Sequence, residues 1–148
     1  MSGRGGEAGF TLLELLLVLL LLGLAYGVAA PMIGAGSTGL DVQAASRQIA
    51  AGLRKARGTA VGTRGEATLT LDVEGRRFAV SGDPKDYALP KRLEFALFTA
   101  QSEVVRDGSA GIRFFPDGSS TGGRVTVSAG EAKREVDVDW ITGRVTIR

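Results

Sequence analysis

The spacing of hydrophobic residues changes twice along the chain and divides it into three parts. From Phe10 to Ile33 the sequence is almost continuously apolar, and Glu14 is the single charged residue in that stretch. As a helix, this stretch would span roughly 36 Å at about 1.5 Å per residue, enough to cross the hydrocarbon core of a bilayer. The first part therefore predicts a transmembrane helix over residues 10–33.

The second part, residues 34–64, is predicted to contain a linker followed by an amphipathic helix. Several glycines lie between Gly34 and Asp41, and Pro31 precedes them. These residues favour a kink or a local break in the helix, with a new helix capped at Ser37, Thr38 or Asp41. Apolar residues then recur at intervals of three to seven as far as about Val61. The predicted buried stripe consists of Val42, Ile49, Leu53, Ala56 and Ala60.

In the third part, residues 65–148, apolar and polar residues alternate with the period of β-strands. We expect a hairpin over 66–82, a strand over 92–98, two strands joined by a glycine-rich loop over 111–130, and a closing hairpin over 134–148. One face is predicted to carry Leu93, Phe95 and Leu97, and in the closing hairpin Val136, Val138 and Trp140 share a face. About seven short strands beside one long helix indicate an α+β fold with an antiparallel β domain.

Composition narrows the chemistry that the chain could support. It has no histidine, which removes the commonest general base and metal ligand, and no cysteine. Catalytic triads built on histidine and ordinary zinc sites are therefore excluded. The net charge of +2 is too small to indicate nucleic-acid binding by itself.

Two motifs in the third part could carry chemistry, and each has a simpler structural interpretation. The loop Asp117–Arg124 has the glycines and hydroxyls of a phosphate-binding loop. It lacks the Gly-Lys-Ser/Thr ending and is followed by a strand, so a plain β connection is favoured. Asp137 and Asp139 are predicted to lie on one strand face and could bind a cation. No other carboxylates cluster there, which favours a solvated face. We predict no metal, cofactor or catalytic site.

The predicted amphipathic helix carries five basic residues and no acidic one between Val42 and Gly65. They are Arg47, Arg54, Lys55, Arg57 and Arg64. A solvated face near the helix C-terminus would explain them, since the helix dipole favours cations there. The alternative is a surface for phosphate, lipid headgroups or an acidic protein.

Glu14 is the anomaly of the apolar segment, because a carboxylate deep in a bilayer costs roughly 2.5–3.5 kcal/mol. One explanation is a capping box, since Thr11 and Glu14 have the spacing in which each side chain binds a backbone amide at the start of a helix. The other is an ion pair with a positive charge of another subunit. The spacing alone does not separate the two explanations.

The motif Gly9-Phe10-Thr11-Leu12-Leu13-Glu14 resembles the processing site of type IV pilins and type II secretion pseudopilins. The resemblance implies a leader over residues 1–9, cleavage between Gly9 and Phe10 by prepilin peptidase, and N-methylation of Phe10. It also implies an N-terminus in the cytoplasm, and Pro31 falls where many members carry a helix-kinking proline. A cleaved secretory signal is the rival interpretation, but the apolar run is longer than a typical signal.

The last forty residues sharpen this resemblance. The stretch Phe114–Gly123 and the segment Val138–Ile147 are similar to the end of the minor pseudopilin H family of type II secretion systems. The resemblance implies a structural, non-enzymatic subunit in the bacterial inner membrane with a periplasmic domain. Its partners would be prepilin peptidase, the major pseudopilin, the other minor pseudopilins and the inner-membrane assembly platform. A calcium-binding major pseudopilin is disfavoured, because no acidic loop precedes the C-terminus.

This family gives Glu14 a physical role. After cleavage, the new amine of Phe10 is a cation at the start of an apolar helix, and Glu14 of a neighbouring subunit could neutralise it. The alternative is a minor pilin of a type IV pilus that binds DNA through the basic residues between Arg47 and Arg64 and the basic C-terminus.

Overall fold

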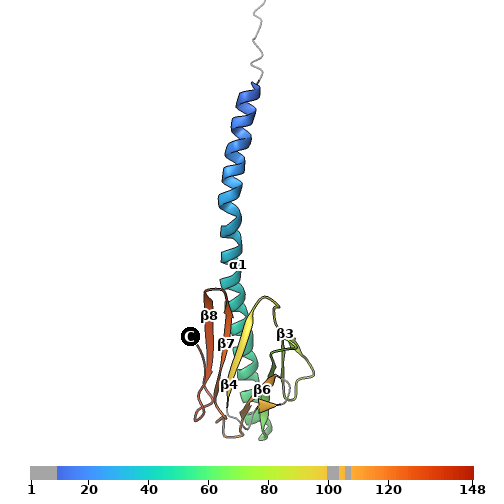
Figure 1. Ribbon diagram of the computed structural model, residues 1–148. Helices are drawn as coiled ribbons and strands as arrows, with labels where there is room; N and C mark the ends of the chain where they lie inside the picture. The colour runs from blue at the N-terminus through green and yellow to red at the C-terminus, as the bar shows by residue number, and fades with distance from the viewer. Residues whose placement is uncertain (1–9, 100–103, 106–107) are drawn as a thin grey trace, which may run out of the picture. The chain divides into compact units, whose positions relative to one another are not determined.

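The computed structural model describes the backbone of residues 10–99, 104–105 and 108–148, and the side chains of residues 10–26, 38–99 and 108–148. The chain forms two compact units, unit 1 up to Ser37 and unit 2 from Thr38 to Arg148. One helix, α1 (Leu12–Thr63), contributes residues to both units and is labelled in Figure 1.

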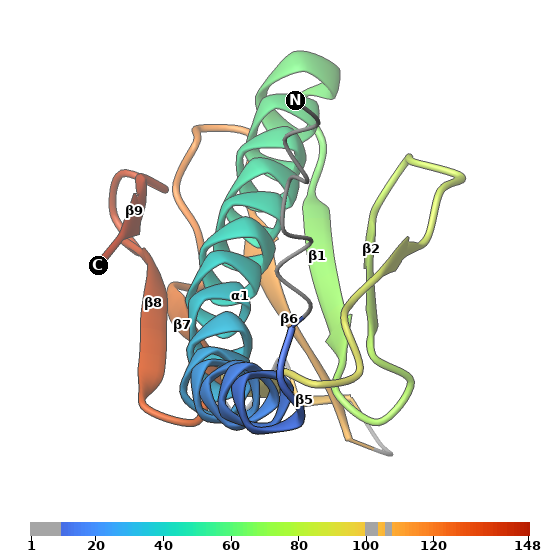
Figure 2. The same ribbon diagram turned by 90° about the horizontal axis from the view of Figure 1, so that it is seen from above.

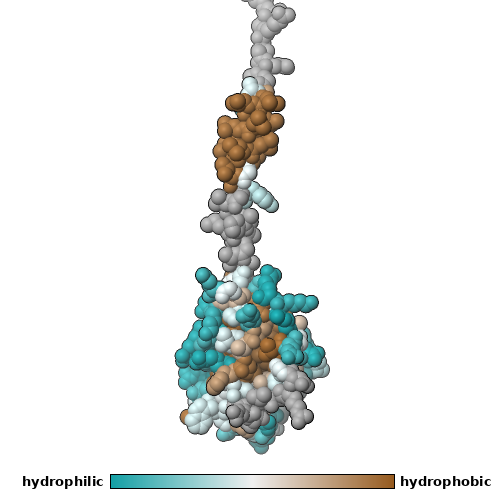
Figure 3. All heavy atoms as spheres, viewed as in Figure 1, coloured by the Kyte–Doolittle hydropathy of each residue, from teal (hydrophilic) through white to brown (hydrophobic). Residues whose placement is uncertain are grey.

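Unit 1 is the leucine-rich part of α1. Its described leucines are all exposed, Leu15 by 54% and Leu24 by 61%, and the described part of this segment is apolar over the face seen in Figure 3. Within the side chains that the structure describes, no helix is both long and apolar enough to cross a membrane. The leader 1–9 and residues 27–33 of the predicted membrane segment, with Pro31, lie outside these described side chains.

The backbone of α1 stays helical through Gly34–Asp41. The predicted local break, and the new cap at Ser37, Thr38 or Asp41, are therefore wrong. A glycine lowers helix propensity by only about 1 kcal/mol relative to alanine. Each residue added to an existing helix also gains a hydrogen bond, so these glycines do not force the helix to end.

Unit 2 packs two antiparallel sheets on the C-terminal part of α1, and Figure 2 shows β1 and β2 on one flank of the helix and β7 and β8 on the other. The first sheet has the order β3-β2-β1-β6-β5 and the second the order β4-β7-β8-β9. The strands of the first sheet are β1 (Ala67–Asp72), β2 (Arg77–Val80), β3 (Tyr87–Ala88), β5 (Val104–Val105) and β6 (Ser109–Phe114). Those of the second are β4 (Glu94–Thr99), β7 (Gly123–Ala129), β8 (Ala132–Val138) and β9 (Val145–Ile147).

The predicted helical stripe is confirmed as the centre of the core. All five of its members are buried, from Val42 at 1% exposed to Ala60 at 0%. They pack with inward side chains of both sheets, such as Leu69 and Val127. In β1 burial alternates strictly along the strand, as expected where one face of a sheet covers a helix. The helix thus supplies apolar surface that both sheets share.

The α+β fold with an antiparallel β domain is confirmed. The described residues form nine strands rather than about seven, because β3 and β5 are two-residue strands without an alternating pattern of their own. The prediction that Trp140 shares a face with Val136 and Val138 is wrong. The two valines are 0% and 6% exposed, whereas Trp140 is 65% exposed. The strand β8 ends at Val138, so the inward alternation stops before the tryptophan.

Candidate functional site

The processing motif lies at the start of α1. Thr11 is the N-cap residue: its side-chain Oγ1 accepts a hydrogen bond from the amide of Glu14 at 3.3 Å, and its carbonyl accepts one from Leu15 at 3.1 Å. Phe10 is 79% exposed. Gly9, the other residue of the predicted cleavage site, lies outside the described residues.

Thr11 supplies its half of the predicted capping box, whereas no described hydrogen bond joins the Glu14 carboxylate to Thr11. No lysine or arginine occurs between Phe10 and Ser46, and no cation in the described part of the chain pairs with Glu14. The carboxylate stands in the first turn of α1, where the helix dipole favours a negative charge.

Of the five basic residues between Val42 and Gly65, four lie on α1 and Arg64 follows its end, and three of the four bind groups within unit 2. The Arg54 guanidinium donates to the carbonyl of Val145 at 3.4 Å, and Arg57 Nε donates to the carbonyl of Gly118 at 3.1 Å. Lys55 forms an ion pair with Asp83. These three basic residues therefore connect the helix to three different loops or strands of the β domain. Neither a fully solvated helix face nor a nucleic-acid surface would require such contacts.

The Lys55 contact belongs to a small polar network beside the first sheet. The Asp83 carboxylate also accepts a hydrogen bond from the Tyr87 hydroxyl at 2.8 Å and one from the amide of Lys85 at 3.1 Å. Hydrogen bonds from Lys55 first, then from Tyr87 and the Lys85 amide, lower the pKa of Asp83 to about 2. The ring of Tyr87 stacks on Phe78 with centroids 4.8 Å apart, so the network is fixed to the core.

Arg57 lies against two glycines from different loops. Gly118 belongs to the connection between β6 and β7, and Gly143 to the connection between β8 and β9. Both have positive φ, 85° and 63°. A Cβ built on Gly118 would lie 3.0 Å from the guanidinium, and one on Gly143 would lie 2.9 Å from Arg57 Nε. The absence of side chains lets the loops close on the arginine.

Aspartates organise these two loops from within. One oxygen of Asp117 accepts hydrogen bonds from the amide and hydroxyl of Ser119. One oxygen of Asp139 accepts bonds from the amides of Ile141 and Thr142 and from the Thr142 hydroxyl. These hydrogen bonds, to Ser119 and chiefly to Thr142 respectively, lower the pKa of both carboxyl groups. Both aspartates thus stabilise the turns in which they lie.

Ser120 joins the two loops. It is 5% exposed, its amide donates to the carbonyl of Trp140 at 2.9 Å, and its hydroxyl donates to the carbonyl of Asp139 at 3.1 Å. The same hydroxyl accepts a hydrogen bond from the amide of Gly122 at 3.0 Å. The segment Asp117–Arg124 is therefore the β connection that the sequence favours, fastened to its neighbour.

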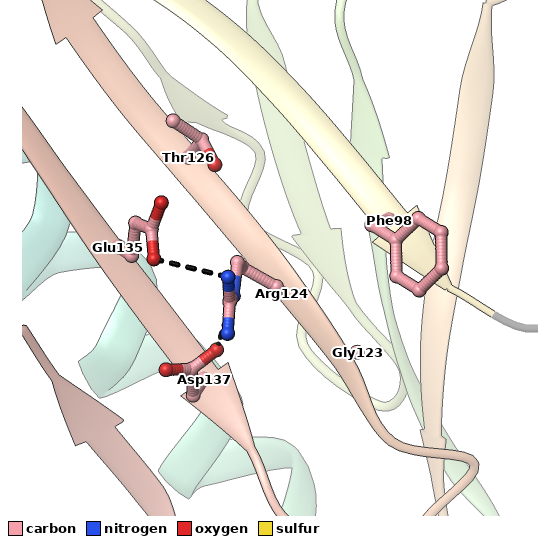
Figure 4. Close-up of a pocket in the computed structure, with 6 residues that line it drawn as sticks. All are labelled: Phe98, Gly123, Arg124, Thr126, Glu135 and Asp137. Atoms are coloured by element: carbon pink, nitrogen blue, oxygen red, sulfur yellow. Dashed lines mark hydrogen bonds and ion pairs between the residues drawn. The ribbon is translucent and has the colours of Figure 1, made fainter.

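Asp137 and Asp139 do not form one site. Asp137 lies in β8 and pairs with Arg124 and Arg148, whereas Asp139 lies beyond the strand. Figure 4 shows the Arg124 guanidinium between Glu135 and Asp137, with Phe98 on the neighbouring strand. Over the described residues, no group of three or more histidine, cysteine, aspartate or glutamate residues could hold a metal ion. The outer face of the second sheet is a ladder of ion pairs.

The sequence analysis did not predict the hydrogen bonds between the β6–β7 and β8–β9 loops, nor the polar network around Asp83. The loop spacing held a signal, because Asp-x-Ser at Asp117 and Asp-x-x-Thr at Asp139 are patterns in which the aspartate binds its own turn. The ion pair of Lys55 with Asp83 joins residues 28 positions apart and has no local signal.

The fold and the N-terminal motif define a class of proteins. Residues 4–30 match the prokaryotic N-terminal methylation motif. The minor pseudopilin EpsH of the Vibrio cholerae type II secretion system is similar with a TM-score of 0.58 at 11% identity, over 73% of this chain and 96% of EpsH. The type IV minor pilin FimU of Pseudomonas aeruginosa is similar with a TM-score of 0.56 at 16% identity, over 72% and 87%. At such identities these structures show the fold alone, which is pilin-like.

The sequence comparisons identify the family within this class. Residues 45–143 match the family of type II transport protein GspH. The type II secretion system protein H of Xanthomonas campestris pv. campestris is 38% identical over 137 residues, which covers 93% of this chain and 80% of the relative. The chain belongs to the GspH family, the minor pseudopilins of type II secretion systems, and the resemblance seen in its sequence is confirmed.

Proposed function

We propose that this chain is an inner-membrane subunit of a pseudopilus that helps export folded proteins across the outer membrane. Residues 10–33 would span the membrane with the N-terminus in the cytoplasm and unit 2 in the periplasm. The observation that carries this proposal is the union, in one chain, of an N-terminal methylation motif and a GspH domain. The role is structural: the chain takes no cofactor and performs no catalytic step.

The proposal includes processing between Gly9 and Phe10 by prepilin peptidase and N-methylation of Phe10. The motif supports this, as does the exposure of Phe10 directly before the first turn of α1. The intact mass of the protein extracted from membranes tests it. We expect a chain that begins at Phe10 and carries one methyl group. A chain that still begins at Met1 in cells with active peptidase would refute the processing step.

Glu14 would then pair with the amine of Phe10 from a neighbouring subunit. The isolated position of the carboxylate in the described chain supports an external partner. A buried ion pair need not stabilise an assembly overall, but one charge buried alone is expensive, typically 3–5 kcal/mol when a partner is removed. Pairing would therefore favour one axial register between subunits, as buried polar groups do in coiled coils.

Two neighbouring substitutions separate this role from capping. Glu14→Gln keeps the size of the side chain and removes its charge, so we expect membrane insertion with poor co-assembly. Thr11→Ala removes the cap hydrogen bond, worth about 1 kcal/mol, and keeps the carboxylate, so assembly should persist. Cross-linking to the major pseudopilin in membranes measures both. Undiminished assembly of Glu14→Gln, or equal loss in both variants, would contradict the charge role.

The partners that we propose are the major pseudopilin, the other minor pseudopilins and the inner-membrane assembly platform. A strain lacking this chain tests the whole function, by comparing secreted enzymes in the medium with DNA uptake and pilus-dependent motility. We expect secretion to fail while pili remain intact. Normal secretion with lost uptake or motility would assign the chain to a type IV pilus instead.

The DNA-binding alternative has a narrow basis in the structure. Arg54, Lys55 and Arg57 bind groups of unit 2, which leaves Arg47 and Arg64 of the basic run for a phosphate backbone. Binding of the full chain in detergent to duplex DNA at low salt tests this, since the phosphate contribution is largest there. We expect no saturable binding.

A further inference from the structure

Three large apolar side chains stay exposed at one end of unit 2. Phe98 is 80% exposed, Trp140 65% and Ile141 62%, and we call these three residues the aromatic end surface. In unit 2, the described side chains include just two other exposed large apolar residues, Leu40 and Val61. The surface adjoins the two loops that contact Arg57. Arg57 itself lies in the last two turns of α1. Large apolar side chains that gather at a protein surface are typical of interaction sites.

A groove of about 350 Å³ separates the two aromatic residues. Phe98 and Trp140 line it, together with Gly122 and Gly123. Gly122 has a φ of 71° and a Cβ there would lie 3.0 Å from the Cβ of Trp140, so the glycine lets the tryptophan lie close to the neighbouring loop. The groove has room for one large apolar side chain of a partner.

The tryptophan is presented by a loop that is rigidly held. Its carbonyl accepts the Ser120 amide, the next residues are bound by Asp139, and Arg57 packs against Gly143 on the same loop. A loop whose backbone is fixed before binding loses less conformational freedom when it docks. Tryptophan is also the residue type most enriched among those that dominate binding energy. A loop that is fastened by these hydrogen bonds and exposes a tryptophan is therefore suited to contact a partner.

The charges beside the surface indicate which partner it fits. Arg57 and Arg144 flank the loop that carries Trp140 and Ile141, and neither has a carboxylate within ion-pair distance in the described residues. Arg144 acts on Asp139 through a weaker, longer-range attraction. The aspartates of the two loops already accept several hydrogen bonds from their own turns. The Arg144 guanidinium and the remaining N–H groups of Arg57 have no hydrogen-bond acceptor among the described residues, so a complementary partner offers carboxylates there.

We propose that the aromatic end surface docks a segment of another pilin-like subunit in which an apolar side chain is flanked by acidic residues. The apolar side chain enters the groove between Phe98 and Trp140, and the carboxylates pair with Arg144 and with the guanidinium N–H groups of Arg57. This assignment rests on the proposed pseudopilus function and names the surface by which this subunit meets a neighbour.

Binding between purified full-length proteins in detergent tests the proposal. The probes are the other pilin-like subunits of the same secretion system, titrated one by one. We expect one of them to bind the wild-type chain and to lose at least tenfold in affinity with Trp140→Ala and with Arg144→Glu. The control is Glu131→Ala, an exposed charge in the turn at the other end of the β7–β8 hairpin, which should leave the affinity unchanged. Wild-type affinity in both test variants, or no binding of any subunit to the wild-type chain, would overturn the proposal.

Cysteine labelling gives a second readout that does not depend on removing the tryptophan. The natural chain contains no cysteine, so Ile141→Cys and Glu131→Cys each report one position. In membranes with the complete secretion system, we expect a maleimide to label Ile141→Cys more slowly than in a strain that lacks the other pilin-like subunits. Labelling of Glu131→Cys should not change. Equal labelling of Ile141→Cys in the two strains would overturn the proposal.

The outcomes also separate this proposal from the function on which it rests. If secretion is normal without the chain, the pseudopilus function fails. If secretion needs the chain but Trp140→Ala and Arg144→Glu restore it fully and bind normally, the function stands and the docking surface is wrong.

Discussion

Gly52 lies where α1 meets the first sheet, and alanine at this position sets two effects of opposite sign against each other. Alanine is favoured over glycine inside a helix by about 1 kcal/mol. A Cβ at Gly52, however, would lie 2.6 Å from Phe78 Cε2 and 3.0 Å from Leu69 Cδ1. Because Phe78 is 1% exposed and stacks on Tyr87, its ring cannot move aside freely.

Overpacking of a core by one carbon costs about 1–3 kcal/mol, so the clash should outweigh the gain in helix propensity. We expect Gly52→Ala to lower the free energy of unfolding by about 1 kcal/mol, and by as much as about 2. Gly58→Ala is the matched control, since a Cβ there meets nothing within 4 Å. This variant should be stabilised by about 0.5–1 kcal/mol.

Urea unfolding followed by near-ultraviolet circular dichroism compares the two variants, because that signal reports the packing of aromatic side chains. The slope of the unfolding free energy against urea concentration should be the same in both variants, so that their midpoints give the difference in stability. If Gly52→Ala proves as stable as Gly58→Ala, the close packing of α1 on Phe78 described above is incorrect.

Two further predictions concern the polar contacts of unit 2. Asp83 has a pKa of about 2 in the folded chain against an ordinary value of 3.8, so its pairing with Lys55 stabilises the fold above pH 3.8 and this contribution is lost as the pH falls towards 2. The melting temperature should drop over that window, and Asp83→Asn should flatten the drop; an unchanged profile would exclude this contribution. Gly143→Ala should destabilise the fold by at least about 1 kcal/mol more than Gly130→Ala. Both glycines have positive φ, but a Cβ at Gly143 would collide with Gly118 and Arg57 whereas Gly130 has open space; equal urea midpoints would contradict this.

The helix and most of the sheets could be predicted because each is written in a local pattern. Val42 and Ile49 repeat at a helical spacing, and both are buried. Leu69 and Leu71 alternate with threonine, and both face the core in β1. The GspH family was likewise recognisable from short motifs at the two ends of the chain, because processing and turn formation each depend on a few adjacent residues.

Local patterns misled at two places, for different reasons. The glycines of Gly34–Asp41 indicate a break, yet the helix continues through them, because glycine weakens a helix without preventing it. The alternation of Val136 and Val138 predicts that Trp140 faces inward. The strand ends first, and a loop bound by Asp139 turns the tryptophan outward.

The sequence by itself determined the anchor-like segment, the processing motif, the helical stripe and the class of fold, since hydrophobic spacing and short motifs act through neighbouring residues. The tertiary structure decided what the cations of α1 do and where Trp140 points. Arg57 meets Gly118 and Gly143 only after the chain has brought residues 61 and 86 positions away against the helix. No pattern along the chain encodes such a meeting, because its energy comes from groups that become neighbours only on folding.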